Sequence, residues 1–219
     1  MDHASDLDEQ VTQLGQELRA GTKNSLTKTE LLEIIIPWKF AVGKPRHALR
    51  KHLESNTAAA VVQCTQRGIG LARDIDADNN DDDDDLESNI KAALLAVTQL
   101  AGVGPATASL VLSLVRPDVF CYLFDEVIDC FCPQRTYTMP VYLKCSAACR
   151  QICAALEANE WTPAQVARTL WTAARVCAAN SLEDYTLSTL LPTTSSSRKR
   201  KAANTSSNGQ SKNRPSASK

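Results

Sequence analysis

Apolar residues recur at helical spacing along most of the chain, and no segment shows a convincing strand pattern. Between residues 86 and 100, Ile90, Leu94, Val97 and Leu100 would share one face of a helix. The same reading predicts further helices over residues 30–41, 45–56, 57–73, 105–115, 140–159 and 163–179. The chain is therefore expected to adopt an all-α fold.

Local signals predict where several helices begin. Thr27 and Glu30 form a capping box ahead of the first of these helices, and Pro37 should kink that helix or end its first part. Asn56 is expected to cap the helix that follows it. Residues 162–165 combine a threonine cap, a proline at the first position and a glutamine at the third, which predicts a clean start for the last helix.

The composition indicates one helical domain with tails. Of 219 residues 43% are hydrophobic but only 5% are aromatic, which favours helices packed on helices. We place this domain at residues 25–186. Residues 1–24 are expected to be marginal, with a short helix broken by Gly15 and Gly21. Residues 187–219 have the Ser-rich, basic composition of a disordered tail.

The formal net charge of −1 hides a strong asymmetry along the chain. Nine acidic residues lie between Asp74 and Glu87, and like-charge repulsion leads us to expect a flexible insertion over 74–85. From Ser188 to the C-terminus the chain has seven lysines or arginines and no acidic residue.

A basic tetrad lies in this tail. It consists of Arg198, Lys199, Arg200 and Lys201. Short basic clusters in exposed tails are typical of nuclear import signals, and they also bind polyanions without specificity. We therefore expect a nuclear protein that is recognised by an import receptor.

Secretion, membrane insertion and metal binding are not expected. The N-terminal residues are acidic and lack an apolar stretch, and no apolar run is long enough to span a membrane. The eight cysteines of an intracellular chain should be reduced thiols. Cys145, Cys149 and Cys153 would share one helix face, but no zinc-site spacing accompanies them, so we expect buried side chains with no metal and no cofactor.

The stretch Gly102-Val103-Gly104 separates two helical patterns and is the strongest local motif. Both glycines are expected at positive φ, and Pro105 suits the first turn of the next helix. The free N–H groups of such a corner can bind a phosphate. The predicted DNA contacts of this turn are Gly102, Val103, Gly104, Ala106 and Thr107. The alternative is a purely structural helix–helix turn.

A basic cluster precedes the turn in the sequence. Lys39, Lys44, Arg46 and Arg50 are candidate contacts for the DNA backbone, and Arg46 and Arg50 would share a helix face. The alternative is the solvated face of an amphipathic helix.

The stretch "LAGVGPATASLVLS", residues 100–113, closely resembles the hairpin of the helix-hairpin-helix DNA glycosylase superfamily. The resemblance implies a DNA-binding hairpin and a catalytic aspartate some twenty residues later. "VFCYLFDEVID", read as a loop leading into a short helix, places Asp125 there. Ala106 stands where bifunctional members have the lysine that forms a Schiff base, so no lyase activity by that route is implied. Together with "PWKFAVGKPR", the motifs resemble a eukaryotic group within or beside this superfamily that has no assigned chemistry.

Three functions remain open from the sequence. The first is a non-catalytic module that binds the DNA backbone, which we favour because only Asp125 matches the residues that do the chemistry. The second is a monofunctional glycosylase-like hydrolase that uses Asp125. The third is a helical scaffold for protein interactions. Asp125 could also serve only as a helix cap or as the partner of a cation. A pocket beside Asp125 that admits a flipped base would favour the enzyme.

Overall fold

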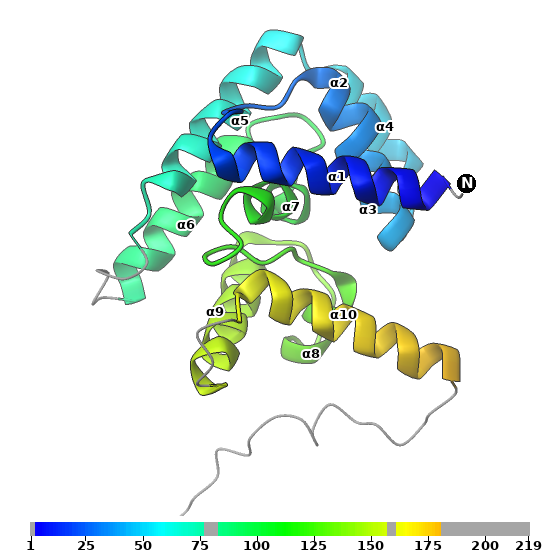
Figure 1. The fold of residues 1–219 in the computed structure, drawn as a ribbon, viewed down its shortest axis with the longest axis vertical. Helices are drawn as coiled ribbons and strands as arrows, with labels where there is room; N and C mark the ends of the chain where they lie inside the picture. Colours follow the sequence, from blue (N-terminus) through cyan, green and yellow to red (C-terminus); the bar gives the residue numbers. More distant parts are fainter. Residues whose placement is uncertain (1–2, 77–82, 157–160, 181–219) are drawn as a thin grey trace, which may run out of the picture. The chain divides into compact units, whose positions relative to one another are not determined.

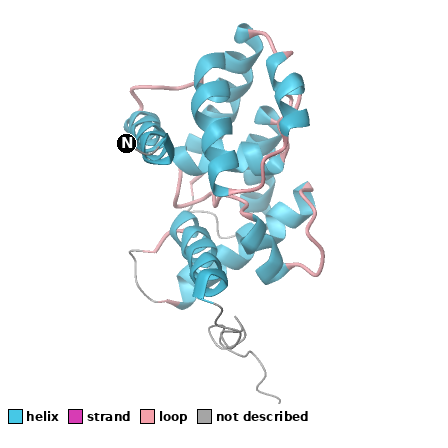
Figure 2. Cartoon of the chain, turned by 90° about the vertical axis from the view of Figure 1, so that its right-hand side faces the viewer, coloured by secondary structure: helices cyan, strands magenta, loops and turns pink. Residues whose placement is uncertain are grey.

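The computed structural model describes residues 3–76, 83–156 and 161–180. Over these residues the chain forms helices and connecting segments but no strand, which confirms the all-α prediction (Figure 2). No described helix is both long and apolar enough to cross a membrane. The predicted tail and its basic tetrad lie outside these ranges, as do residues 77–82 of the predicted insertion.

The helices follow one another in the order shown in Figure 1. They are α1 (His3–Ala20), α2 (Lys28–Glu30), the π-helical turn η1 (Leu31–Ile35), α3 (Ile36–Val42), α4 (His47–Glu54), α5 (Ala58–Arg73), α6 (Asp83–Val97), α7 (Pro105–Val115), α8 (Asp125–Phe131), α9 (Met139–Ala155) and α10 (Pro163–Asn180). The predicted bounds of the helix over 105–115 are those observed.

Helix α7 lies at the centre of the packing. Its residues are apolar or small on every side, and all of them from Ala106 to Ser113 are buried. A helix that is apolar all round has to be covered on all sides. Helices α1, α5, α6 and α9 contact it, and α1 crosses in front of it in Figure 1. The start of α7 is therefore held by several elements at once.

The N-terminal segment is part of the core, so the expectation that it is marginal is wrong. Helix α1 runs without a break through Gly15, and Leu7, Val11, Leu14 and Leu18 along it are buried. Contact with α7 stabilises the helix more than the glycine weakens it. All described residues, α1 included, fall within one compact unit.

Several predicted boundaries differ from the structure, but the prediction for Pro37 agrees with it. The first part of the helix, η1, ends at Ile35, and Pro37 lies in the first turn of α3, where its missing N–H costs little. Helix α4 begins at His47 rather than at Pro45. Thr57 caps α5 in place of Asn56, because the Thr57 hydroxyl accepts a hydrogen bond from the N–H of Ala60 at 3.1 Å.

Several cysteines are buried within this packing. Cys121, Cys145 and Cys149 have no exposed surface, and all eight cysteines are free thiols. They act in the core as small apolar side chains.

Candidate nucleic-acid interface

The turn between α6 and α7 reverses the chain at a single glycine. Gly102 has φ of +77°, and a Cβ built on it would lie 3.0 Å from the Cβ of His52 and 3.2 Å from the backbone nitrogen of Leu53. Both the backbone conformation and the close approach of α4 therefore require glycine here.

Gly104 does not have the positive φ that we expected. Its φ is −97° and its ψ is −178°, an extended conformation open to any residue, and it forms the N-cap of α7. The chain has already been reversed at Gly102, so Gly104 only has to lead into the helix. A Cβ at Gly104 would meet no atom within 4 Å, which leaves open space in front of the start of α7.

Asn56 fixes the turn to the α4–α5 junction. Its Oδ1 accepts a hydrogen bond from the N–H of Ala101 at 2.9 Å, and its Nδ2 donates to the carbonyl oxygen of Ala101 at 2.9 Å. The amide side chain thus pairs with both backbone polar groups of one residue, Ala101. The sequence offered no signal for this role beyond an asparagine at a helix junction.

A cavity of about 130 Å³ opens at the turn, and we call it the turn pocket. It brings together eight of the ten residues predicted as DNA contacts or as the catalytic acid. They are Lys39, Lys44, Arg46, Gly102, Gly104, Ala106, Thr107 and Asp125. The rest of its lining is formed by Phe40, Gly43, Leu49, Tyr122, Leu123 and Tyr137. Residues more than 80 positions apart in the sequence therefore share one site.

Two predicted contacts do not line the turn pocket. Val103 is buried in the core, with 5% of its surface exposed. Arg50 lies on the exposed side of α4 and pairs with Glu54 at 2.8 Å and with Glu33 at 3.3 Å. The helical spacing of Arg46 and Arg50 misled us because Arg46 precedes the first residue of α4 and need not follow its periodicity.

Lys39 comes from α3 and forms the inner cationic group of the pocket. Its Nζ donates a hydrogen bond to the hydroxyl of Thr107, in the first turn of α7, at 2.5 Å. Burial, together with the positive charge of Arg46, lowers the pKa of Lys39 from 10.5 to about 8, and the negative charge of Asp125 opposes both effects. Among the described residues, no ion pair includes Lys39.

Lys44 and Arg46 are exposed and stand at the mouth of the pocket. The guanidinium of Arg46 lies over the ring of Tyr137, 4.3 Å from its centroid, which is a cation–π contact. Neither cation belongs to an ion pair in the part of the chain that the structure describes. Their charges therefore face solvent at the pocket entrance.

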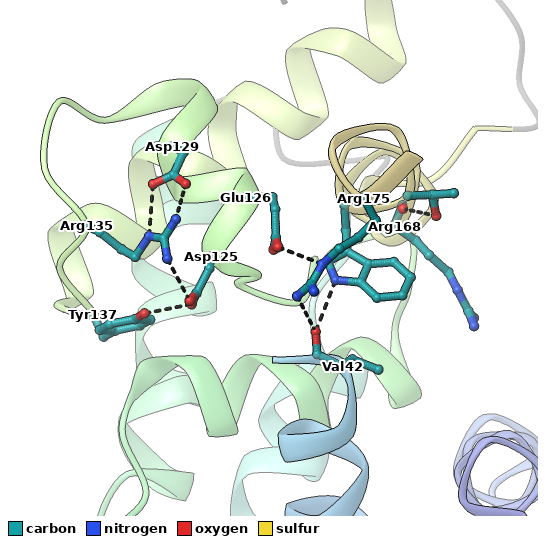
Figure 3. A network of polar contacts seen from close by, with 10 residues as sticks. Val42, Asp125, Glu126, Asp129, Arg135, Tyr137, Arg168 and Arg175 are labelled. Atoms are coloured by element: carbon teal, nitrogen blue, oxygen red, sulfur yellow. Dashed lines mark hydrogen bonds and ion pairs between the residues drawn. The ribbon is translucent and has the colours of Figure 1, made fainter. Parts of the chain in front are cut away.

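Asp125 is the first residue of α8, and its carboxylate is fully engaged (Figure 3). One oxygen lies 3.0 Å from the guanidinium of Arg135, and the other accepts a hydrogen bond from the Tyr137 hydroxyl at 2.6 Å. The N-cap is Phe124, and no side chain caps α8, so Asp125 is the partner of a cation and not a cap. Nothing in the sequence had pointed to Arg135 or Tyr137.

The other acidic residues of α8 are paired as well. Asp129 shares the guanidinium of Arg135, and Glu126 lies 3.0 Å from that of Arg175. Arg175 also donates to the carbonyl oxygen of Val42, and so does the indole N–H of Trp171 (Figure 3). These contacts connect α8 and α10 to the end of α3, beside the mouth of the turn pocket.

Tyr122 contributes a polar group that sequence reasoning missed. Only 7% of its surface is exposed, yet its hydroxyl has no hydrogen-bond partner among the residues that the structure describes. Burial raises its pKa well above the usual value, and the negative charge of Asp125 adds to this. Tyr122 therefore has a largely buried ring and presents a neutral hydroxyl that can donate to a ligand in the pocket.

No group of three or more potential metal ligands gathers within the described ranges. Comparison with known proteins adds no relative: no family model matches the chain, and neither a curated protein nor a solved structure matches it.

Proposed function

We propose that this protein binds the DNA backbone at the turn pocket, with α6, the turn and α7 acting as a helix-hairpin-helix, and that it does so without catalysis. One observation carries the proposal: the pocket gathers the turn glycines with three cations, Lys39, Lys44 and Arg46, that have no carboxylate partner among the described residues. Unpaired cations around a cavity favour an anionic ligand.

The start of α7 supports a phosphate as that anion. Pro105 has no N–H, and the N–H of Ala106 has no acceptor within the helix. Among the described residues no side chain caps α7, so none of them takes the place of a ligand there. Free N–H groups at a helix N-terminus favour phosphate, and such contacts position a protein on DNA without reading its sequence.

Two features argue against base removal at Asp125. Both of its oxygens are engaged, by Arg135 and by Tyr137, and these contacts stabilise the ionised carboxylate and make it a weaker base towards water. A cavity of about 130 Å³ is also well below the 300 Å³ or so at which ligand pockets usually begin, whereas a flipped nucleotide needs a pocket that holds the whole base. The binding function is therefore favoured over the glycosylase-like alternative.

The proposal is tested by measuring the affinity for a labelled DNA duplex at several salt concentrations. Lys44→Glu and Arg46→Glu should each weaken binding and reduce the slope against the logarithm of salt concentration by about one. Lys144→Glu on α9 changes the net charge equally at an exposed site outside the pocket, and should bind like the wild type. Equal losses of DNA affinity in all three variants, or no DNA binding at low salt, would contradict the proposal and favour the alternative of a helical scaffold for protein interactions.

The nuclear location is proposed from the tail alone. Replacing the tetrad Arg198, Lys199, Arg200 and Lys201 by alanine should reduce nuclear accumulation of the full chain, because an import receptor reads clustered positive charge. An unchanged distribution would mean that the tetrad is not the import signal.

A further inference from the structure

The inner end of the turn pocket carries a donor without an acceptor. The side chain of Tyr122 is more than nine-tenths buried, and its hydroxyl makes no hydrogen bond to a described residue but, unlike the hydroxyl of Tyr142, is not sealed from solvent. Water in the pocket can accept its hydrogen bond, and a ligand that displaces this water has to accept in its place. Lys39 and Thr107 lie at the same pocket, so a ligand that reaches Tyr122 also approaches a cation.

The net charge of the pocket favours a doubly charged ligand. Among the described lining residues Asp125 is the only acid, and it shares Arg135 with Asp129. These two carboxylates and Arg135 together carry one negative charge, so the three positive charges of Lys39, Lys44 and Arg46 leave a net charge of about +2. A phosphodiester carries one negative charge, whereas a phosphate monoester carries about −1.5 to −2 near pH 7. The monoester therefore matches the pocket better.

The size of the pocket favours a phosphate monoester over a phosphodiester. Its volume of about 130 Å³ lies below the roughly 300 Å³ at which pockets for drug-sized ligands begin, so it suits a phosphate group better than a whole nucleoside. A phosphodiester has a sugar on each of two oxygens, so it stays at the mouth beside Lys44 and Arg46. A monoester has a sugar on one oxygen only and can point the other three inwards, towards Tyr122.

We propose that the turn pocket accepts the terminal phosphate of a DNA strand, with Tyr122 and Lys39 contacting the phosphate at the inner end. This inference rests on the proposed DNA-binding function and names the form of DNA that the site prefers. It predicts that the protein distinguishes phosphorylated strand ends from hydroxyl ends, which backbone binding alone does not.

The experiment uses the full chain and one DNA hairpin with a single open end. The hairpin is prepared with a 5′-phosphate, with a 3′-phosphate or with hydroxyl groups only, and affinities are compared by fluorescence anisotropy. At least one phosphorylated form should bind about tenfold more tightly than the hydroxyl form, the gain of a charge-assisted hydrogen bond. Inorganic phosphate, added at constant ionic strength, should abolish this preference while leaving the hydroxyl form bound.

Tyr122→Phe is the decisive variant because it removes only a hydroxyl that makes no hydrogen bond to a described residue. It should lose most of the preference for phosphorylated ends and still bind the hydroxyl form like the wild type. Tyr142→Phe is the matched control, since the Tyr142 hydroxyl also has no partner in the described part of the chain but is sealed in the core and does not line the pocket. This variant should keep the preference.

Affinities within about twofold for all three forms would overturn the inference and leave the proposed function standing. A preference that survives in Tyr122→Phe would overturn the assignment to this pocket. No binding of any form at low salt would overturn both the inference and the proposed function.

Discussion

The two sides of the turn pocket differ in how their charged side chains are paired. One side, the cationic wall, is formed by α3 and the segment after it, and the other, the α8 wall, by the start of α8. Lys39, Lys44 and Arg46, from α3 and the segment after it, have no carboxylate partner in the described chain. On the α8 wall, by contrast, every acidic side chain is paired with an arginine, since Arg135 serves Asp125 and Asp129 and Arg175 serves Glu126. The α8 acids therefore stabilise the fold, whereas the cations opposite remain available to a ligand.

Placing an acid on the cationic side should have the largest effect. Gly104→Asp is compatible with the extended backbone and the open space at this N-cap, so stability should change by only a few tenths of a kcal/mol. The new carboxylate would accept a hydrogen bond from the free N–H of Ala106 and repel phosphate, so DNA affinity should fall by about tenfold or more.

Gln151→Glu, at an exposed position of α9, alters the net charge by the same amount and serves as the control for the Gly104 variant. Its DNA affinity should stay within about twofold of the wild type. Unchanged binding by Gly104→Asp would mean that no anion approaches the start of α7.

Gly102→Ala should act on stability instead. The added methyl group would lie 3.0 Å from the Cβ of His52 on α4, and alanine is strained at the positive φ of this position. We therefore expect a loss of roughly 1–3 kcal/mol in the free energy of unfolding. Urea denaturation followed by circular dichroism measures it. Wild-type stability would show that the turn can relax without its glycine.

The cationic wall should weaken at alkaline pH. Lys39 has a pKa of about 8 and faces Arg46 and Asp125, while Tyr137, with a pKa raised to about 12 by burial and by its bond to Asp125, stays neutral. DNA affinity should therefore fall several-fold between pH 7 and 9 as Lys39 loses its proton. Lys39→Arg should show no such step. A step that persists in that variant would assign the titration to another group.

The same lysine should lower the stability of the free protein. Because its pKa is lower in the folded chain than its ordinary value of 10.5, the cost of burying its charge is complete below pH 8 and is relieved as the pH rises towards 10.5. Lys39→Met should consequently raise the melting temperature at pH 7, while DNA binding weakens. A lower melting temperature would show that the bond to Thr107 outweighs the burial.

Removing a negative charge from the α8 wall should strengthen DNA binding slightly, whereas the changes on the cationic wall weaken it strongly. Asp125→Asn deletes the only acid of the pocket but keeps an oxygen that can accept from Tyr137, so DNA affinity should rise by a few-fold at most. Loss of the partly buried ion pair with Arg135 should cost about 1 kcal/mol or less. Weaker binding, or loss of a base-releasing activity, would instead support a catalytic Asp125.

Arg50→Ala should have the smallest effect. Arg50 pairs with Glu33 and Glu54 on the exposed side of α4, so its removal should change DNA affinity by less than about twofold. A salt dependence reduced by one contact would show that Arg50 reaches DNA after all.

Local patterns in the sequence were sufficient for the helices. Apolar spacing identified the all-α fold and the bounds of α7, and the capping boxes at Thr27 and Thr162 are present as predicted. These features depend on residues within four positions of one another, which the sequence displays directly. The motif around Gly102 likewise identified the turn and, with the basic cluster, half of the residues that line the pocket.

Only the tertiary structure decided which of these residues matter and how. The core role of α1 depends on α7, and the need for glycine at position 102 depends on α4. The partners that engage Asp125, and those that keep Arg50 away from the pocket, lie up to 17 positions away in the sequence. The hydroxyl of Tyr122 is available to a ligand because no described residue forms a hydrogen bond with it. Charge pairing and desolvation depend on distances in space, and the order of residues along the chain does not contain those distances.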